Sequence, residues 1–323
     1  MTAEGSFGGM GGAAAYTGLY HSGELAKRTK RASEILEQCE VCPHRCRVNR
    51  LANETGRCGT GARALVSSYG PHFGEEAPLV GYNGSGTIFF ANCNLKCAFC
   101  QNYSISQLGE GSEVSEEALA RMMVSLQEKG CHNINLVSPT HVVPHILKAL
   151  ELAAAWGLSV PLVYNSGGYD LVETLRLLEG LVDIYMPDMK YSDDGIARQL
   201  SGIDDYASVN RAAVREMHRQ VGDLQLDEDG IATRGLLVRH LVLPNRLAGS
   251  AETVRFLAKE ISSNTYVNVM AQYGPCHEAF HFPLLGRSIT REEFVEAVDL
   301  ARQQGLGRLD RLDSPTIMRM LFP

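Results

Sequence analysis

From Thr87 onward, short apolar runs alternate with longer stretches in which apolar residues recur every three or four positions. The short runs are rich in Val, Ile and Leu, which is typical of parallel strands covered on both faces. The longer stretches are typical of helices that pack one face against a sheet. Six strand–helix units follow in order. Strands are predicted over 87–91, 134–137, 160–164, 181–186, 235–243 and 266–270. Helices are predicted over 116–129, 143–156, 171–178, 194–220 with interruptions, 251–261 and 291–304.

This alternation predicts an α/β fold in which helices cover a parallel sheet. The pattern alone leaves two architectures open, a doubly wound sheet and an incomplete barrel. In both, the residues that follow the carboxyl ends of the strands form the functional site.

The chain before Thr87 lacks this alternation of strands and helices and is rich in glycine, turn residues and cysteine. Its glycine-rich start predicts a flexible tail over 1–20. Residues 21–86 contain one predicted helix, 24–38, and many turn signals, so we expect a bound metal to stabilise this cysteine-rich region. The large α/β unit is expected over 87–312 and a C-terminal tail over 313–323.

The composition is that of a globular protein, because 45% of the 323 residues are hydrophobic and 21% are charged. The 30 Lys and Arg residues against 37 Asp and Glu give a net charge of −7 without a basic tract, so we expect no nucleic-acid partner. No apolar run reaches about 18 residues and no signal-peptide pattern opens the chain, so we expect no membrane span and a cytoplasmic location. In that reducing compartment, clustered cysteines hold metal more often than they form disulfides.

Three cysteines lie within eight residues directly after the first predicted strand, at Cys93, Cys97 and Cys100. Their thiolates can wrap one metal centre. A [4Fe–4S] cluster normally takes four cysteines, so three would leave one iron open to a ligand that is not protein. The alternatives are a zinc knuckle lacking one ligand, or three cysteines buried without a metal role.

The C-x3-C-x2-C spacing after a strand, with the aromatic Phe99 before the third cysteine, resembles the radical S-adenosylmethionine superfamily. Residues 92–102 are similar to the activating-enzyme branch, which includes pyruvate formate-lyase activating enzyme, and more similar still to its PflX-type relatives. The resemblance also rests on residues 42–46, 53–59, 137–141, 186–191, 241–245 and 268–273. It implies a partial (β/α)6 TIM-like barrel rather than a doubly wound sheet.

The resemblance implies that a [4Fe–4S] cluster on the three cysteines binds S-adenosylmethionine and cleaves it reductively. The resulting 5′-deoxyadenosyl radical would abstract hydrogen from a substrate, which makes the protein an oxidoreductase. The substrate is either a glycine of a glycyl radical enzyme or a small molecule or peptide in a biosynthetic pathway. A reductase, flavodoxin or ferredoxin would donate the electron. The alternative from another class is an iron–sulfur electron carrier or a zinc-stabilised interaction module.

The resemblance also implies contacts to S-adenosylmethionine, although no residue that acts on the substrate is predicted. Where the activating enzymes have Gly-Gly-Glu, this chain has Ser138 and Thr140, whose oxygens would accept from the methionyl ammonium. Lys190 matches the lysine near the methionyl carboxylate. Adjacent strand residues face opposite ways, so only one of Arg239 and His240 faces the pocket. The predicted cofactor-binding set is Phe99, Ser138, Thr140, Asn165, Ser166, Asp188 and Lys190.

Four further cysteines lie in the N-terminal region, at Cys39, Cys42, Cys46 and Cys58. Four thiolates complete a metal site, which suits a tetrahedral zinc or a second [4Fe–4S] cluster. A complete ligand set favours a structural or electron-relay role over bond breaking at that metal. The alternative is four buried or regulatory thiols.

Overall fold

The computed structural model describes residues 14–310, and its framework is a sheet of parallel strands. Residues 1–13 and 311–323, which hold most of the predicted N-terminal tail and the predicted C-terminal tail, lie outside the described residues. Each predicted strand is present, with its bounds moved by a few residues. The six parallel strands are β2 (Ser85–Phe90), β4 (Ile134–Val137), β5 (Leu162–Ser166), β6 (Ile184–Pro187), β8 (Ala232–Leu241) and β9 (Tyr266–Met270).

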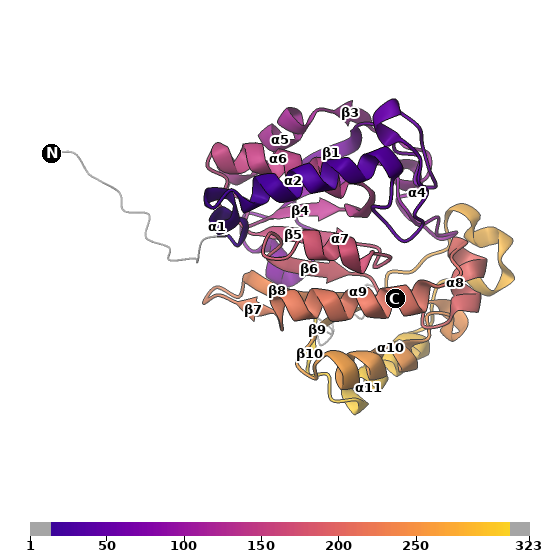
Figure 1. The fold of residues 1–323 in the computed structure, drawn as a ribbon. Coiled ribbons are helices and arrows are strands. Elements are labelled where there is room, and N and C mark those ends of the chain that lie inside the picture. The colour runs from indigo at the N-terminus through magenta and orange to yellow at the C-terminus, as the bar shows by residue number, and fades with distance from the viewer. Residues whose placement is uncertain (1–13, 311–323) are drawn as a thin grey trace.

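The order of the strands decides between the two architectures. The sheet runs β10-β9-β8-β6-β5-β4-β2-β1-β3, where β1 is Ala64–His72. The parallel strands therefore follow one another without the reversal that defines a doubly wound sheet. The end strands β3 (Ser112–Val114) and β10 (Arg308–Leu309) are not paired with each other, so within residues 14–310 the barrel is open. The fold is therefore a partial TIM-like barrel, with helices on its outer face (Figure 1).

Capping residues and glycines set the ends of several outer helices. Ser115 caps one of them, because its side chain accepts from the backbone N–H of Ala118. The interrupted helical stretch predicted over 194–220 is two helices, because Gly202 adopts a φ of +64° and ends the first of them. The helices are α5 (Glu116–Glu128), α6 (Val143–Ala155), α7 (Val172–Leu177), α8 (Asp194–Ser201), α9 (Tyr206–Val221), α10 (Ser250–Phe256) and α11 (Arg291–Gln303). No described helix is long and apolar enough to cross a bilayer.

The segment before β2 packs onto the barrel. The predicted helix 24–38 is α2 (Glu24–Glu34) with a 3-10 turn after it, and α2 lies against α6. Before it, α1 (Tyr16–His21) overlaps the end of the stretch predicted as a tail, and Tyr16 is buried with its hydroxyl donating to the carbonyl of Val160 at 3.0 Å.

One strand of this segment was not predicted. Strand β1 (Ala64–His72) pairs antiparallel with β2 and β3, and its burial alternates only at its start. Half of β1 is therefore solvent-facing and carries no continuous apolar run, which explains why the sequence pattern missed it. After β1, the chain passes through α3 (Ala77–Val80) back to the start of β2. This return places residues 72–76 beside the barrel interior.

Candidate functional site

The register of the parallel strands brings their carboxyl ends together. Phe89 is opposite Val137, and Val137 is opposite Asn165. Asp188, just beyond β6, is opposite Arg239. A cavity of about 500 Å³ opens at this edge. Its lining includes the loop after β2, the ends of β4, β5, β6, β8 and β9, and residues 72–76.

All three cysteines of the loop after β2 line this cavity. The loop is held by backbone contacts: Ala98 N–H donates to Leu200 O at 2.7 Å, and the Gln107 side-chain amide donates to Cys97 O at 2.9 Å. The short helix α4 (Tyr103–Ser106) follows the loop.

The sulfur atoms of the loop already have polar neighbours. Ser201 Oγ donates to Cys97 Sγ at 3.2 Å, and Leu95 N–H donates to Cys93 Sγ at 3.4 Å. Cys100 Sγ and Ser106 Oγ are 3.1 Å apart. Burial raises the pKa of Cys93 to about 12 and also raises that of Cys97. Without a metal these thiols are therefore neutral, and metal coordination would remove their protons.

The donor set fits a cluster with an open iron. Three thiols face one cavity, and no other cysteine within residues 14–310 lines it. Among the described residues, no three His, Cys, Asp or Glu side chains are arranged to hold a single ion. The thiols instead face a space large enough for a cluster and a bound molecule, with hydrogen-bond donors behind two of the sulfurs.

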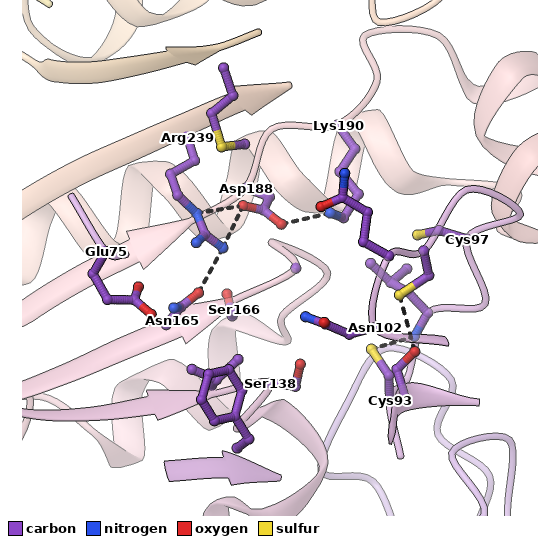
Figure 2. A pocket seen from close by; sticks show the side chains of 18 of the residues that line it. Glu75, Cys93, Cys97, Asn102, Ser138, Asn165, Ser166, Asp188, Lys190 and Arg239 are labelled. Atoms are coloured by element: carbon purple, nitrogen blue, oxygen red, sulfur yellow. Dashed lines mark hydrogen bonds and ion pairs between the residues drawn. The ribbon is translucent and has the colours of Figure 1, made fainter. Parts of the chain in front are cut away.

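Asp188 links two cations on the wall of the cavity (Figure 2). Its Oδ2 accepts from Lys190 Nζ at 2.6 Å, and its Oδ1 accepts from Arg239 Nε at 2.8 Å. Burial alone would raise the pKa of Asp188, but Arg239 and Lys190 hold it below its usual range. Burial opposes the charge of Lys190, yet Asp188 keeps the pKa of that ammonium above its ordinary value. All three groups are therefore charged.

Of the adjacent pair in β8, Arg239 faces the cavity and His240 faces away. Arg239 Nη2 donates to Asn165 Oδ1 at 2.7 Å. His240 is buried, and its ring nitrogens contact Met189 O at 2.7 Å and Ser250 Oγ at 2.9 Å. Adjacent side chains of a strand point to opposite faces, so one of these two residues had to face the cavity. Only the tertiary structure shows which one does.

Ser138, Asn165 and Ser166 line the cavity together with Asp188 and Lys190. Ser138 has a φ of +58°, a conformation that non-glycine residues rarely adopt and that is common at functional sites. Its backbone N–H donates to Asn165 O at 2.9 Å, which fixes the end of β4 to the end of β5.

Two members of the predicted cofactor-binding set do not line the cavity. Thr140 is buried and donates to Asp170 Oδ1 at 2.7 Å, and the same carboxylate accepts from Ser166 Oγ at 2.6 Å. Phe99 is buried edge-on against the rings of Tyr191 and Tyr273. In this structure both side chains support the cavity wall from behind.

The end of the cavity away from the cysteines is acidic, and the sequence pattern gave no indication of it. Figure 2 shows Glu75 on the opposite side of Asp188 from Cys93 and Cys97. Glu76 is buried there, and its Oε1 accepts from Asn268 Nδ2 at 3.0 Å while its Oε2 has no partner. Burial raises the pKa of Glu76. These residues come from a turn-rich segment whose approach to the barrel depends on the path of the chain, so no local signal marks them.

The four N-terminal cysteines lie outside this cavity. Cys39 and Cys42 are buried, whereas Cys46 and Cys58 are partly exposed. Burial raises the pKa of Cys42, and the nearby Cys58, Cys39 and Cys46 raise it further. The four thiols are therefore neighbours.

Comparisons with known proteins agree with this site. Residues 87–218 match the sequence model of the family described as Radical SAM superfamily. The chain is 34% identical over 291 residues to Uncharacterized protein MJ0674 of Methanocaldococcus jannaschii, covering 87% of this chain and 79% of that protein. The chain belongs to the radical SAM superfamily, whose members use a [4Fe–4S] cluster and S-adenosylmethionine. It is therefore an enzyme of this class, and it needs an electron donor.

Solved structures of the class are more distant. The structure of Streptococcus suis SuiB bound to precursor peptide SuiA has a TM-score of 0.46 and 12% identity, and the match covers 68% of this chain. The chain spans only 46% of that SuiB chain. Methylornithine synthase (PylB) has a TM-score of 0.43 and 12% identity, and the match covers 94% of this chain and 85% of that one.

Proposed function

We propose that Cys93, Cys97 and Cys100 hold a [4Fe–4S] cluster with one open iron, at which the enzyme cleaves S-adenosylmethionine reductively and starts hydrogen abstraction from a substrate. The observation that carries this proposal is that the three thiols line one cavity, where no other cysteine of residues 14–310 joins them. When bound, the cluster supplies the single electron that breaks the sulfonium carbon–sulfur bond and yields a 5′-deoxyadenosyl radical.

The residues of the chain bind and orient S-adenosylmethionine. Lys190 is a partly buried cation between the cysteine loop and Asp188, and it neutralises the methionyl carboxylate. The Ser138 and Asn165 oxygens that line the cavity accept from the methionyl ammonium or the ribose hydroxyls. Asp170 fixes the Ser166 hydroxyl, so the wall is rigid where the ligand docks.

The finer assignment is a PflX-type enzyme related to the glycyl-radical activases. Its support is the set of sequence motifs in the loops after the strands, together with residues 42–46 and 53–59 of the N-terminal region. The hydrogen comes from a protein glycine in one version of this function and from a small molecule or peptide in the other. A deuterium-labelled glycyl radical enzyme separates them, because deuterium appears in 5′-deoxyadenosine only if a glycine of that protein is the donor.

The test of the chemistry is anaerobic reconstitution with iron and sulfide, followed by dithionite and S-adenosylmethionine. We expect a brown protein that releases methionine and 5′-deoxyadenosine. Cys97→Ala should abolish the release, whereas Cys131→Ala, a buried thiol at the start of the β4 unit, should retain it. A reconstituted protein that forms no 5′-deoxyadenosine, or a Cys97→Ala variant as active as the wild type, would overturn the proposal.

A further inference from the structure

We propose that Cys39, Cys42, Cys46 and Cys58 hold a second [4Fe–4S] cluster, fully ligated by the chain, that relays single electrons from a reduced flavodoxin or ferredoxin to the cluster of the catalytic loop. This inference rests on the proposed function, because a relay needs the catalytic cluster as its acceptor. No bond or proton changes in the relay: the donor protein loses one electron, and the catalytic cluster gains it.

The first support is the backbone around Cys39, Cys42 and Cys46. Arg47 N–H donates to Cys39 O at 2.9 Å and Cys39 N–H donates to Val48 O at 3.0 Å, so the chain turns back on itself between these residues. Arg45 and Arg47 have φ values of 41° and 56°. Such left-handed backbone costs free energy in non-glycine residues and is kept mainly at functional sites. The result is a tight cysteine knuckle, residues 39–46, with three cysteines within eight residues. The catalytic loop holds its three cysteines within the same length of chain.

The turn that carries Cys58 closes against this knuckle. Arg57 N–H donates to Cys46 Sγ at 3.4 Å, and Gly59 N–H donates to Gly56 O at 3.0 Å. A Cβ atom at Gly56 would lie 2.7 Å from Cys46 Sγ, so only glycine permits this approach. The fourth cysteine is thereby brought to the other three by tertiary contacts.

A buried cation beside the cysteines calls for a negative group. Arg50 is 1% exposed, and its guanidinium donates to Gly61 O at 3.0 Å and His141 O at 2.7 Å. Among the described residues Arg50 forms no ion pair with a carboxylate, and its side-chain neighbours are His145 Nε2 at 3.4 Å and Cys39 Sγ at 4.0 Å. Buried charges are stable when paired. A thiolate-ligated cluster supplies that negative charge, whereas four neutral thiols do not.

The proposed relay requires a cluster rather than zinc. Four thiolates can hold either a tetrahedral zinc or a [4Fe–4S] cluster. Zinc has no redox chemistry, whereas a cluster accepts and passes on single electrons.

Two contacts join this site to the catalytic loop. His44, between Cys42 and Cys46, places Nε2 2.8 Å from the carbonyl of Asn94, the residue that follows Cys93. Arg57, next to Cys58, donates to Ser201 O at 3.3 Å, and Ser201 Oγ donates to Cys97 Sγ.

The exposure of the four cysteines fits a relay. Cys46 and Cys58 are partly exposed, which gives a donor protein access, while Cys39 and Cys42 are buried. The N-terminal site thus reaches from the surface to residues that touch the ligands of the catalytic cluster. A purely structural metal site has no need of such contacts.

The first experiment counts metal in the full chain. After anaerobic reconstitution we expect about eight iron atoms in the wild type and about four in the Cys93→Ala/Cys97→Ala/Cys100→Ala variant, with matching sulfide, from two four-iron clusters. Cys131→Ala is the control and should match the wild type. About four iron atoms in the wild type and zinc or no metal in the triple variant would overturn the inference. That result would leave the proposed function intact if the wild type still cleaves S-adenosylmethionine.

The second experiment separates a relay from a structural cluster. Cys58→Ala, with its fold checked by circular dichroism, should keep about four iron atoms on the catalytic loop. Release of 5′-deoxyadenosine should persist with dithionite, a small reductant that reaches the catalytic cluster directly, and be lost with reduced flavodoxin. Equal rates with flavodoxin in Cys58→Ala and wild type would overturn the relay. If Cys58→Ala does not fold, His44→Ala tests the same route, with both clusters retained and the flavodoxin-driven rate reduced.

Discussion

Lys190 and Asp188 form a partly buried ion pair of 2.6 Å on the wall of the cavity that the catalytic cysteines line. Two residues apart after β6, their side chains point to the same face. Arg239 holds the second oxygen of Asp188. The Lys190 ammonium therefore stays charged and in place whether or not a ligand is bound, which is the condition for docking a carboxylate.

Lys190→Met should weaken the binding of S-adenosylmethionine without loss of iron. A hydrogen bond to a charged group contributes about 1.5–3 kcal/mol, which corresponds to a Kd raised about 10- to 150-fold. Equilibrium dialysis with labelled S-adenosylmethionine measures it. Lys148→Met, on the exposed side of α6, is the matched control. An unchanged Kd in Lys190→Met would show that the carboxylate docks elsewhere.

The hydroxyl of Ser201 should tune the catalytic cluster. It donates to Cys97 Sγ at 3.2 Å and contacts the Tyr191 hydroxyl at 2.7 Å. Hydrogen bonds to cluster sulfurs stabilise the more negative, reduced state. Ser201→Ala removes a hydrogen bond of about 1 kcal/mol, so it should lower the midpoint potential by roughly 40 mV for one electron. The variant should keep the iron content of the wild type.

A redox titration followed by electron paramagnetic resonance measures this shift. Ser208→Ala is the control and should leave the potential unchanged, because the exposed Ser208 hydroxyl donates to Asp205 O at the start of α9. The same potential in Ser201→Ala and wild type would mean that the hydroxyl does not reach the cluster.

Gly168 should be far less tolerant of a side chain than Gly157. Both have positive φ, at 75° and 90°. A Cβ at Gly168 would lie 2.0 Å from Asp188 O, while nothing lies within 4 Å at Gly157. Gly157→Ala should cost about 1 kcal/mol from its backbone conformation alone, and Gly168→Ala about 2 kcal/mol or more beyond that. Urea unfolding of both variants tests the difference, and equal losses would contradict it.

Asp183 should make stability depend on pH between about 4 and 6. Burial raises its pKa from the ordinary 3.8 to about 6, against the opposing hydrogen bonds from Leu162 N–H and Ala15 N–H. Because the folded pKa is the higher one, the contribution is present below about pH 4 and is lost as pH rises through about 6. The change is roughly 3 kcal/mol.

Urea unfolding at several pH values checks this prediction. Asp183→Asn should remove this decline in stability across the interval, while Asp299→Asn, on the exposed face of α11, should retain it. A decline of the same size in Asp183→Asn would assign it to another group.

Local features of the chain were enough to predict the strand–helix units. A parallel strand buried on both faces needs a continuous apolar run, and a helix buried on one face needs an apolar residue every three or four positions. The position of Cys93, Cys97 and Cys100 after the first parallel strand followed from the same pattern. So did the shared direction of Asp188 and Lys190, since residues two apart in an extended segment face one side. These features depend on neighbours within a few residues.

The tertiary structure decided what depends on distant neighbours. Strand order chose the open barrel, and sheet register turned Arg239 inward and His240 outward. The return of the chain after β1 brought Glu76 into the cavity, and the docking of the cysteine knuckle placed His44 against Asn94. Residues far apart in sequence meet only through the path and register of the whole chain, so periodicity over a few residues carries no record of these contacts.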